Sequence, residues 1–241
     1  MRVPRFITVP IIENIDADHQ ATLEMFRGLA ADADAFEGYP NPHASRVATI
    51  ADQIGKSFNL GARDRFSLRV AALAHDLGEA AMARGYIGRN GTLSDEERID
   101  LARHPLLGER EAAEAGADRG AQLLVRWHHE WWNGGGYPDG LKFEQIPLGA
   151  RILRVADAYA SLTDTRPFRP AFSERQARQH LLDWIGLEFD PAVVKAILSL
   201  EPFAELKSYG HDREPPPDMP AIAEELMERL ERLGPWSNTT Y

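Results

Sequence analysis

Apolar residues recur at three- and four-residue intervals in almost every segment of this chain. Four stripes show the pattern: Leu23, Phe26, Leu29 and Ala30; Val47, Ile50 and Ile54; Ile152, Val155, Ala156 and Tyr159; Ile222, Leu226 and Leu230. This spacing places the apolar side chains on one face of an α-helix. No segment shows the sustained alternation that is typical of a half-buried strand. The sequence therefore predicts an all-α fold.

Capping signals and glycines predict where the helices begin and end. Helices are predicted over residues 18–33, 43–55, 62–77, 121–131, 147–162 and 219–233, with another running from 94 past 104 and glycine-rich loops at 84–91 and 133–147. Ser94 with Glu97, and Ser173 with Gln176, have the spacing of a capping box. Gly78 is expected to end the helix over 62–77.

The composition excludes several classes of protein. The 241 residues are 44% hydrophobic and 27% charged, which is ordinary for a soluble globular protein with a real core. A net charge of −10 argues against a nucleic-acid binder that uses a broad basic face. Cysteine is absent, which excludes disulfides, thiolate zinc sites and thiol nucleophiles. Residues 1–12 lack a secretion-signal pattern and no run approaches about 20 apolar residues, so a cytoplasmic protein without membrane contact is expected.

Five of the eight histidines form a series with two aspartates. The series is His43, His75, Asp76, His104, His128, His129 and Asp157. Imidazole and carboxylate hold first-row transition metals, and seven such groups are too many for one ion with an open position but suit two. A lone histidine in a helix is usually packed or solvated, and on this ground His19, His180 and His211 are interpreted as structural or surface residues. The series predicts a paired-metal site that acts on a phosphate ester.

Helices of a bundle can hold such ligands rigidly, because each helix fixes its own side chain. His128 and His129 are adjacent within the predicted helix 121–131, so their side chains point about 100° apart. Two neighbouring ions can each take one of them, whereas a single ion cannot easily take both. The pair therefore favours two separate metal positions.

A set of motifs in order resembles the HD-GYP family. They are His43 with Arg46-Val47, His75-Asp76-Leu77-Gly78, His104-Pro105, His128-His129-Glu130, Gly136-Tyr137-Pro138, Arg151-Ile152, Asp157, Arg166-Pro167-Phe168-Arg169 and Phe189-Asp190-Pro191. The match runs from about residue 37 to 200. This family is the bacterial signalling branch of the HD-domain phosphohydrolases, and its members degrade cyclic di-GMP.

The resemblance implies an HD-domain helical bundle with a C-terminal HD-GYP helical extension. It divides the chain into an N-terminal arm with a short helix (1–36), an HD-GYP domain (37–205), and a proline-rich segment with an amphipathic helix and tail (206–241). It also implies that the seven residues of the series are ligands of two divalent metals, with Asp76 bridging. Iron or manganese is expected, and the donor types leave nickel and zinc open.

The activity implied is hydrolysis of cyclic di-GMP to pGpG, and onward to GMP, by a hydroxide bridging the two metals. Asp76 and Glu79 are assigned to catalysis, and Gly136, Tyr137, Pro138, Arg166 and Arg169 to substrate binding. Two alternatives stay open for the last group. Tyr137 can merely pack in a glycine-rich turn, and the two arginines can form surface salt bridges.

Three positions depart from the family pattern. Glu79 stands where lysine is usual, Ala160 where aspartate is usual, and Tyr39 where three-metal members have glutamate. The last favours two metals over three, with Glu37 and Glu79 as conceivable substitutes. The first two remove a lysine and an aspartate that can be partners, so their joint loss is interpreted as one coordinated change. Glu79 puts an anion where a cation stood near the substrate, which weakens attraction for a phosphodiester or requires another group to compensate.

Because of these departures, two other functions remain open. One is an adaptor that binds metal and a cyclic dinucleotide without cleaving it. Another is a phosphohydrolase for a different nucleotide. A cyclic dinucleotide is the expected ligand of the phosphodiesterase and of the adaptor, and the sequence leaves a homodimer or a signalling protein partner open.

Overall fold

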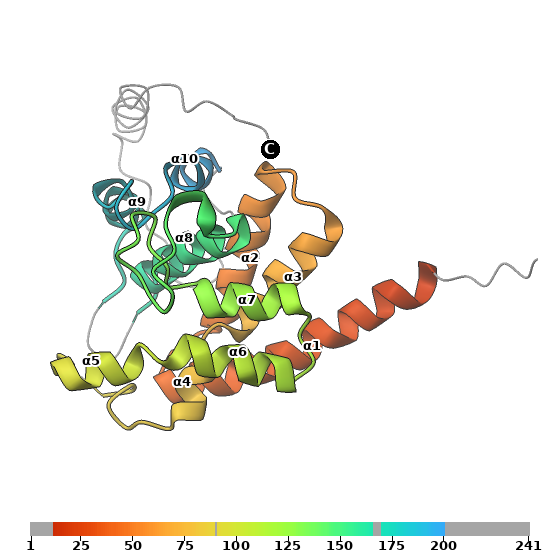
Figure 1. Cartoon of the computed structure of the whole chain (residues 1–241), viewed down its shortest axis with the longest axis horizontal. Helices are drawn as coiled ribbons and strands as arrows, with labels where there is room; N and C mark the ends of the chain where they lie inside the picture. The colour runs from red at the N-terminus through yellow and green to blue at the C-terminus, as the bar shows by residue number, and fades with distance from the viewer. Residues whose placement is uncertain (1–11, 90, 166–169, 201–241) are drawn as a thin grey trace, which may run out of the picture. The chain divides into compact units, whose positions relative to one another are not determined.

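The computed structural model describes residues 12–89, 91–165 and 170–200, with side chains from residue 17 onward. Ten α-helices and a short 3-10 helix make up the regular structure of these ranges (Figure 1): α1 (Ile12–Glu37), α2 (His43–Ser57), α3 (Ala62–Ala74), α4 (Leu77–Met82), α5 (Asp95–Leu101), α6 (His104–Glu114), α7 (Arg119–Trp127), η1 (Phe143–Gln145), α8 (Leu148–Thr163), α9 (Glu174–Asp183) and α10 (Pro191–Ser199). The described residues contain no strand, and the pair Ile185 and Phe189 forms only an isolated bridge. The all-α prediction is confirmed.

Internal contacts divide the chain into two units, residues 1–196 and 197–241. In the first unit, α2 packs against both α3 and α8, and α3 also packs against α1, α7 and α8. The predicted stripe of Val47, Ile50 and Ile54 is fully buried in this core. Packing rather than intrinsic propensity holds such helices together, because an amphipathic face is removed from water.

The first helix is longer than the predicted 18–33 segment. It runs from Ile12 to Glu37 and packs against α2, α3 and α4. Leu23, Phe26 and Ala30 are buried along its inner face, as their spacing predicts. His19 stacks on Phe66 with ring centroids 3.9 Å apart, which agrees with its interpretation as a structural residue.

Gly78 does not end a helix, and that prediction is wrong. The helix predicted over 62–77 ends at Ala74, and Gly78 lies inside the short helix α4. A Cβ atom on Gly78 would lie 2.0 Å from the carbonyl oxygen of His104 and 2.6 Å from the backbone nitrogen of Gly108. Glycine is needed here because α4 and α6 touch backbone to backbone.

The capping boxes predicted at Ser94 and Ser173 are both present. The helix that begins after Ser94 ends at Leu101, and a second helix, α6, opens at His104. The segment predicted as helix over 121–131 ends at Trp127. The predicted helix over 219–233 lies outside the described residues.

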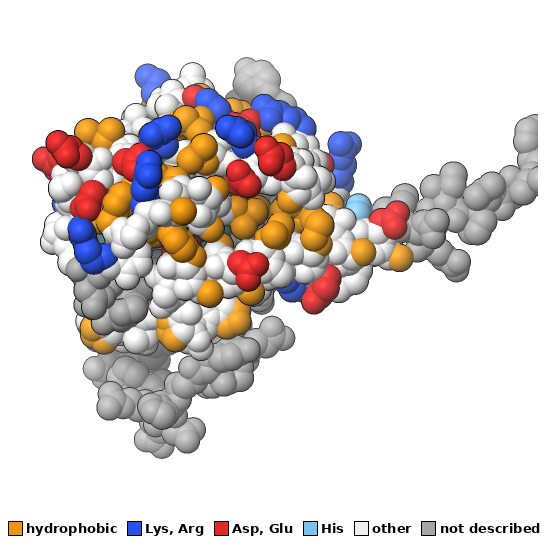
Figure 2. All heavy atoms as spheres, turned by 90° about the horizontal axis from the view of Figure 1, so that it is seen from below, with side chains coloured by type: hydrophobic (Ala, Val, Ile, Leu, Met, Phe, Trp, Pro, Cys, Tyr) orange, Lys and Arg blue, Asp and Glu red, His pale blue; other side chains and the backbone are white. Residues whose placement is uncertain are grey.

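Charges of both signs are mixed with apolar side chains on the face seen in Figure 2. This face carries no broad basic surface, in keeping with the net charge of −10. Among the described residues, no helix combines the length and the apolar character that crossing a membrane requires.

Candidate metal centre

The structure brings all seven residues of the histidine–aspartate series together. Most of them stand at helix ends: His43 opens α2, His75 and Asp76 lie between α3 and α4, His104 opens α6, His128 and His129 follow α7, and Asp157 lies within α8. Burial is nearly complete, with His43, His75, His104 and His128 at most 1% exposed. Six helices of one core, α2, α3, α4, α6, α7 and α8, therefore converge on a single place.

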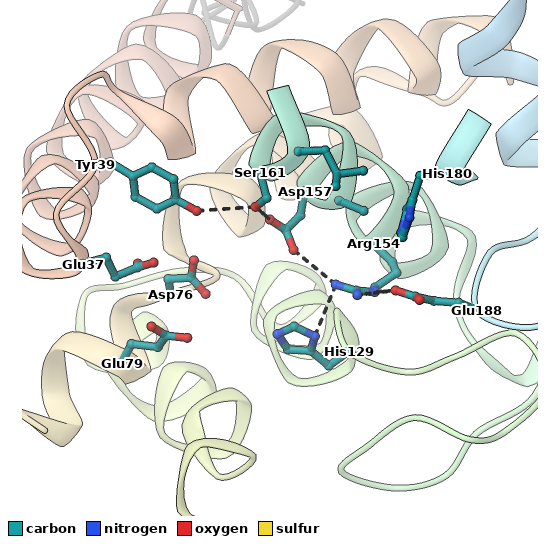
Figure 3. Close-up of a pocket in the computed structure, with 12 residues that line it drawn as sticks. Glu37, Tyr39, Asp76, Glu79, His129, Arg154, Asp157, Ser161, His180 and Glu188 are labelled. Carbon is teal, nitrogen blue, oxygen red and sulfur yellow. Dashed lines mark hydrogen bonds and ion pairs between the residues drawn. The ribbon is translucent and has the colours of Figure 1, made fainter. Parts of the chain in front are cut away.

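A pocket of about 360 Å³ opens beside these residues (Figure 3). Its lining is Glu37, Tyr39, Asp76, Glu79, His129, Arg154, Asp157, Ala158, Ser161, Leu162, His180 and Glu188. The volume is in the range of small-ligand sites. The lining holds five carboxylates and one guanidinium. Because the acids outnumber the arginine, bound cations are needed to balance the charge before an anionic ligand can bind. His180, which was interpreted from the sequence as a structural or surface residue, lines this pocket.

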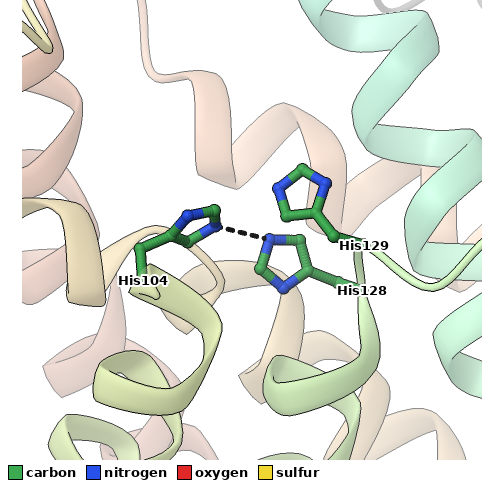
Figure 4. A group of neighbouring side chains, drawn as sticks. All are labelled: His104, His128 and His129. Carbon is green, nitrogen blue, oxygen red and sulfur yellow. Dashed lines mark hydrogen bonds between the residues drawn. The ribbon is translucent and has the colours of Figure 1, made fainter. Parts of the chain in front are cut away.

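The possible metal ligands among the described residues form two separate groups of three. The first group is His43, His75 and Asp157, and the second is His104, His128 and His129, which Figure 4 shows. A third set, Asp76, Glu79 and His104, overlaps the second group at His104. Within each group, one ligand atom of every residue lies within 4.8 Å of the others. Each group can hold one ion while leaving coordination positions open.

Asp76 lies between the two groups. Its Oδ2 is 3.0 Å from Nε2 of His75, in the first group. Its Oδ1 is 3.8 Å from Nε2 of His104 and 3.9 Å from Nε2 of His128, in the second. One carboxylate thus offers one oxygen to each group, which is the geometry of a bridging ligand.

His128 and His129 belong to the same group of possible ligands, whereas their sequence predicted one for each of two metal positions. Their ring centroids are 4.2 Å apart, and both belong to the group that contains His104. The physical reason is that α7 ends at Trp127. His128 is the C-cap and His129 lies in the following turn, so the 100° rotation between successive helix positions does not apply.

Backbone carbonyls orient three of the histidines. His75, His104 and His128 each place Nδ1 close to the carbonyl oxygen of the residue three positions earlier, at 2.9, 2.8 and 2.6 Å respectively. The Nδ1 proton is donated to that oxygen, which leaves the Nε2 lone pair for the centre. The helix ends therefore set both the direction and the tautomer of these rings.

Asp164 orients the fourth ring, that of His43. Its Oδ2 accepts a hydrogen bond from Nδ1 of His43 at 2.9 Å, and its Oδ1 is paired with Arg46. Arg46 also donates to Oγ1 of Thr163 at 2.6 Å. The sequence analysis missed Asp164, although it lies seven residues after Asp157 and so two helical turns along the same face.

We expect Asp164→Asn to weaken metal binding at the first group about 10- to 100-fold, the usual cost of losing the carboxylate partner of a ligating histidine. The amide has no charge to hold the Nδ1 proton of His43. Competition with a chelator, followed by metal analysis, measures the change. Asp32→Asn, at an exposed acid of α1, is the matched control, and equal affinities for the two variants would contradict this role for Asp164.

The electrostatics of the two groups differ. Burial, together with the neighbouring His104 and His75, lowers the pKa of His128 to about 3. Burial likewise lowers the pKa of His104 and His129. The second group therefore consists of neutral imidazoles, the form that binds metal.

Carboxylates dominate the first group. Burial lowers the pKa of His43, but Asp157 and Asp164 outweigh burial and raise it. Burial raises the pKa of Asp157, but His43 and His75 bring it well below its usual value. The buried Nε2 atoms of His43 and His75 make no hydrogen bond, although Oδ1 of Asp157 lies 3.4 Å from the first and Oδ2 of Asp76 lies 3.0 Å from the second. Such orphaned, inward-facing nitrogens beside an ionised carboxylate fit a divalent cation, whose charge replaces the missing partners.

Comparison with protein families decides the family. The family model described as HD domain matches residues 27–193. The chain belongs to the HD-domain family. The motifs quoted for the HD-GYP branch lie within this match.

Two curated relatives and one solved structure are informative. A cyclic di-GMP phosphodiesterase of Vibrio cholerae is 36% identical over 54% of this chain and 28% of its own length. The cyclic di-GMP phosphodiesterase response regulator RpfG of Xanthomonas campestris is 32% identical over 73% of this chain and 47% of its own length. A cyclic GMP-AMP specific phosphodiesterase of V. cholerae matches in structure with a TM-score of 0.60 at 20% identity, over 89% of this chain and 54% of that one, and shows the shared fold. The chain thus spans less than half the length of the two curated relatives.

Two of the departures from the HD-GYP pattern lie in the pocket of this HD domain. Glu79 lines it, with Oε1 3.9 Å from Nδ1 of His104, and burial followed by the charge of Asp76 raises the pKa of its carboxyl well above the usual value. Tyr39 stacks in parallel on His43, with centroids 4.0 Å apart and planes 2° apart. Ala160, the third, is fully buried in α8 and does not line this pocket.

The glycine-rich loop of the HD domain packs against the second group. Tyr137 stacks on His129 with centroids 4.9 Å apart, and its peptide bond to Pro138 is cis. A Cβ on Gly136 would lie 2.2 Å from the backbone nitrogen of Trp131, so only glycine fits. Tyr137 does not line the pocket, and its contact with His129 favours the packing alternative. Arg166 and Arg169 lie outside the described residues.

Other motif residues have structural contacts. Arg151 donates to Oδ2 of Asp190 at 2.6 Å and to the carbonyl oxygen of Ile146 at 2.8 Å, and its guanidinium lies 5.5 Å from the ring centroid of Trp132. It ties α8 to two loops, so we assign it to the scaffold of the HD domain. Arg154 and Glu188 are the charged residues of the pocket that the sequence did not indicate.

Proposed function

We propose that this chain is the catalytic part of a metal-dependent phosphodiesterase that hydrolyses cyclic di-GMP to linear pGpG. The observation that carries the proposal is the pair of three-ligand groups joined by Asp76 beside a pocket of ligand size. The names of the two curated relatives support cyclic di-GMP as the substrate. Cleavage of pGpG to GMP would require the same groups to bind a linear diester.

Two divalent ions, when bound, activate water and neutralise the diester as it is attacked. The six ligands of the two groups would hold them, with Asp76 shared, and iron or manganese suits this mixture of imidazole and carboxylate. The chain holds the ligands rigidly, because backbone carbonyls at helix ends orient the rings of His75, His104 and His128, and Asp164 orients the ring of His43. Burial of the ligands keeps bulk water from the charged groups, which strengthens their interaction with an anionic substrate.

Hydrolysis by protein of known metal content tests the proposal. The protein is purified without oxygen, loaded with manganese or iron, and checked for two ions per chain. Cyclic di-GMP, 3'3'-cyclic GMP-AMP and pGpG are then offered separately. We expect pGpG to form from cyclic di-GMP. If two ions are bound and no cyclic dinucleotide is turned over, the proposal is wrong.

Glu79 favours a second candidate, an adaptor that binds a cyclic dinucleotide without cleaving it. Its carboxyl stands in the pocket where the family pattern has a cation, and it adds to an already acidic lining. An adaptor would show calorimetric binding of cyclic di-GMP with two metals present and no product.

We expect Glu79→Lys to raise the kcat/KM for cyclic di-GMP about tenfold, because it adds a positive charge to the pocket lining that attracts the diester. Glu96→Lys, at an exposed position of α5, makes the same change in net charge outside the pocket lining. A gain with both variants would point to a general charge effect. No gain with Glu79→Lys would show that the acid does not limit turnover.

A further inference from the structure

Arg154 is the one Lys or Arg in the lining of the described pocket (Figure 3). Its side chain is 16% exposed and reaches from α8 towards the metal-ligand groups. The other charged lining residues are five acids. A phosphodiester that enters this pocket meets one fixed positive charge from the described part of the chain.

The contacts of the guanidinium divide it into two sides. Nε and Nη2 both donate to a single oxygen, Oε1 of Glu188, at 2.9 Å for Nε. Nη1 instead lies 3.2 Å from Oδ2 of Asp157 and 3.3 Å from Nδ1 of His129. Asp157 belongs to the first group and His129 to the second, so one nitrogen faces ligands of both groups.

Glu188 is itself held in place by the backbone. Its carbonyl oxygen accepts a hydrogen bond from the backbone N–H of Trp132 at 3.0 Å, and the residue is 8% exposed. A buried carboxylate on a fixed loop anchors one side of the guanidinium, which keeps Nη1 directed at the space between the groups.

Metal binding would change what Nη1 can contact. Asp157 faces His43 and His75 with Oδ1 and Arg154 with Oδ2, so an ion at the first group would take Oδ1 and draw negative charge away from Oδ2. Two divalent ions near the guanidinium would also repel it. An anion between them removes this conflict. A phosphate oxygen is the natural acceptor, because guanidinium nitrogens bind phosphate through charge-assisted hydrogen bonds.

We propose that Arg154 binds a phosphate of the cyclic dinucleotide and takes over the role of the cation that Glu79 has displaced from the opposite wall of the pocket. This inference rests on the proposed function, since it concerns the same substrate. Arg154 acts on the substrate directly, whereas Glu188 is a positioning residue that acts through it.

Calorimetric binding of a hydrolysis-resistant bisphosphorothioate analogue of cyclic di-GMP to manganese-loaded protein tests the inference. We expect Arg154→Gln to keep both ions and to raise the Kd about 10- to 100-fold, the usual cost of a charge-assisted hydrogen bond. Arg154→Lys should lose less, because the charge remains. Arg63→Gln, at an exposed position of α3, controls for net charge.

A double variant, Arg154→Gln with Glu188→Gln, separates binding from structure. If Arg154 only neutralises Glu188, removing both charges restores a wild-type Kd, which would overturn the inference. If Arg154 binds phosphate, the double variant stays as weak as the single one. The double variant also leaves Glu188 without an unpaired buried charge, so we expect it to be less destabilised than the single variant.

The remaining outcomes are equally decisive. An unchanged Kd for Arg154→Gln, or loss of its metals, overturns the inference, the latter because the guanidinium would then act through Asp157 and His129. If hydrolysis by the wild type is intact, the proposed function survives either result. If the wild type binds the analogue through Arg154 but cleaves no cyclic dinucleotide, the function fails and the inference holds.

Discussion

Replacing Asp76 with asparagine is expected to reduce the metal content from two ions per chain and to lower turnover of cyclic di-GMP by about 1000-fold or more, equivalent to about 4 kcal/mol. The Oδ2 atom of Asp76 lies beside His75 of the first group, and its Oδ1 atom lies nearest His104 and His128 of the second group. An amide has one oxygen and no charge, so it cannot serve both groups. Metal analysis and a product assay on the same preparation measure the two effects.

Asp95→Asn is the matched control for this experiment, because Asp95 is an exposed acid of α5. It should keep two ions and wild-type turnover. Retention of both ions and near wild-type turnover by Asp76→Asn would show that Asp76 does not bridge. Loss of turnover with both ions in place would assign Asp76 to the chemistry rather than to holding metal.

The largest expected change in stability comes from Gly78→Ala. The added Cβ would lie 2.0 Å from the carbonyl oxygen of His104 and 2.6 Å from the nitrogen of Gly108, both backbone atoms. No rotamer change can relieve such a contact, so α4 and α6 must separate. We expect the free energy of unfolding to fall by about 3 kcal/mol or more, at the upper end of overpacking effects. Urea denaturation of metal-free protein measures it, since bound metal would add its own stabilisation.

Gly28→Ala provides the control. Gly28 lies in α1, and nothing stands within 4 Å of the place that an added methyl group would take. Alanine also favours helix over glycine. This variant should be unchanged or more stable by about 0.5–1 kcal/mol. Equal free energies of unfolding for the two variants would contradict the close approach of α4 and α6.

Local patterns in the sequence were sufficient for the helices and for the seven polar residues of the centre. The stripe of Val47, Ile50 and Ile54 predicted α2, because burial of one face every 3.6 residues is a local property. Ser94 and Ser173 predicted two helix starts, because a capping box closes within one turn. The histidine series predicted the centre by its residue types alone, and the family match followed from the order of the motifs.

Helix ends were less predictable, and two errors followed from them. Gly78 resembles a stop signal, but its lack of a side chain serves contact with α6, a helix that begins only at His104. His128 and His129 resemble residues of a continuing helix, but α7 ends before them. For Gly78 a contact with another helix outweighed the local preference, and such contacts cannot be recognised from the periodicity of the sequence.

The amino-acid sequence by itself determined the all-α class, the family and which imidazoles and carboxylates are available to hold metal. Only the tertiary structure decided how those ligands divide into two groups, that Asp76 stands between them, and that Asp164 and Arg154 belong to the site. The physical reason is that ligand grouping depends on distances between helices. Those distances are set by packing in the core. Spacing along the sequence predicts the relative positions of residues only within a few turns of the same helix.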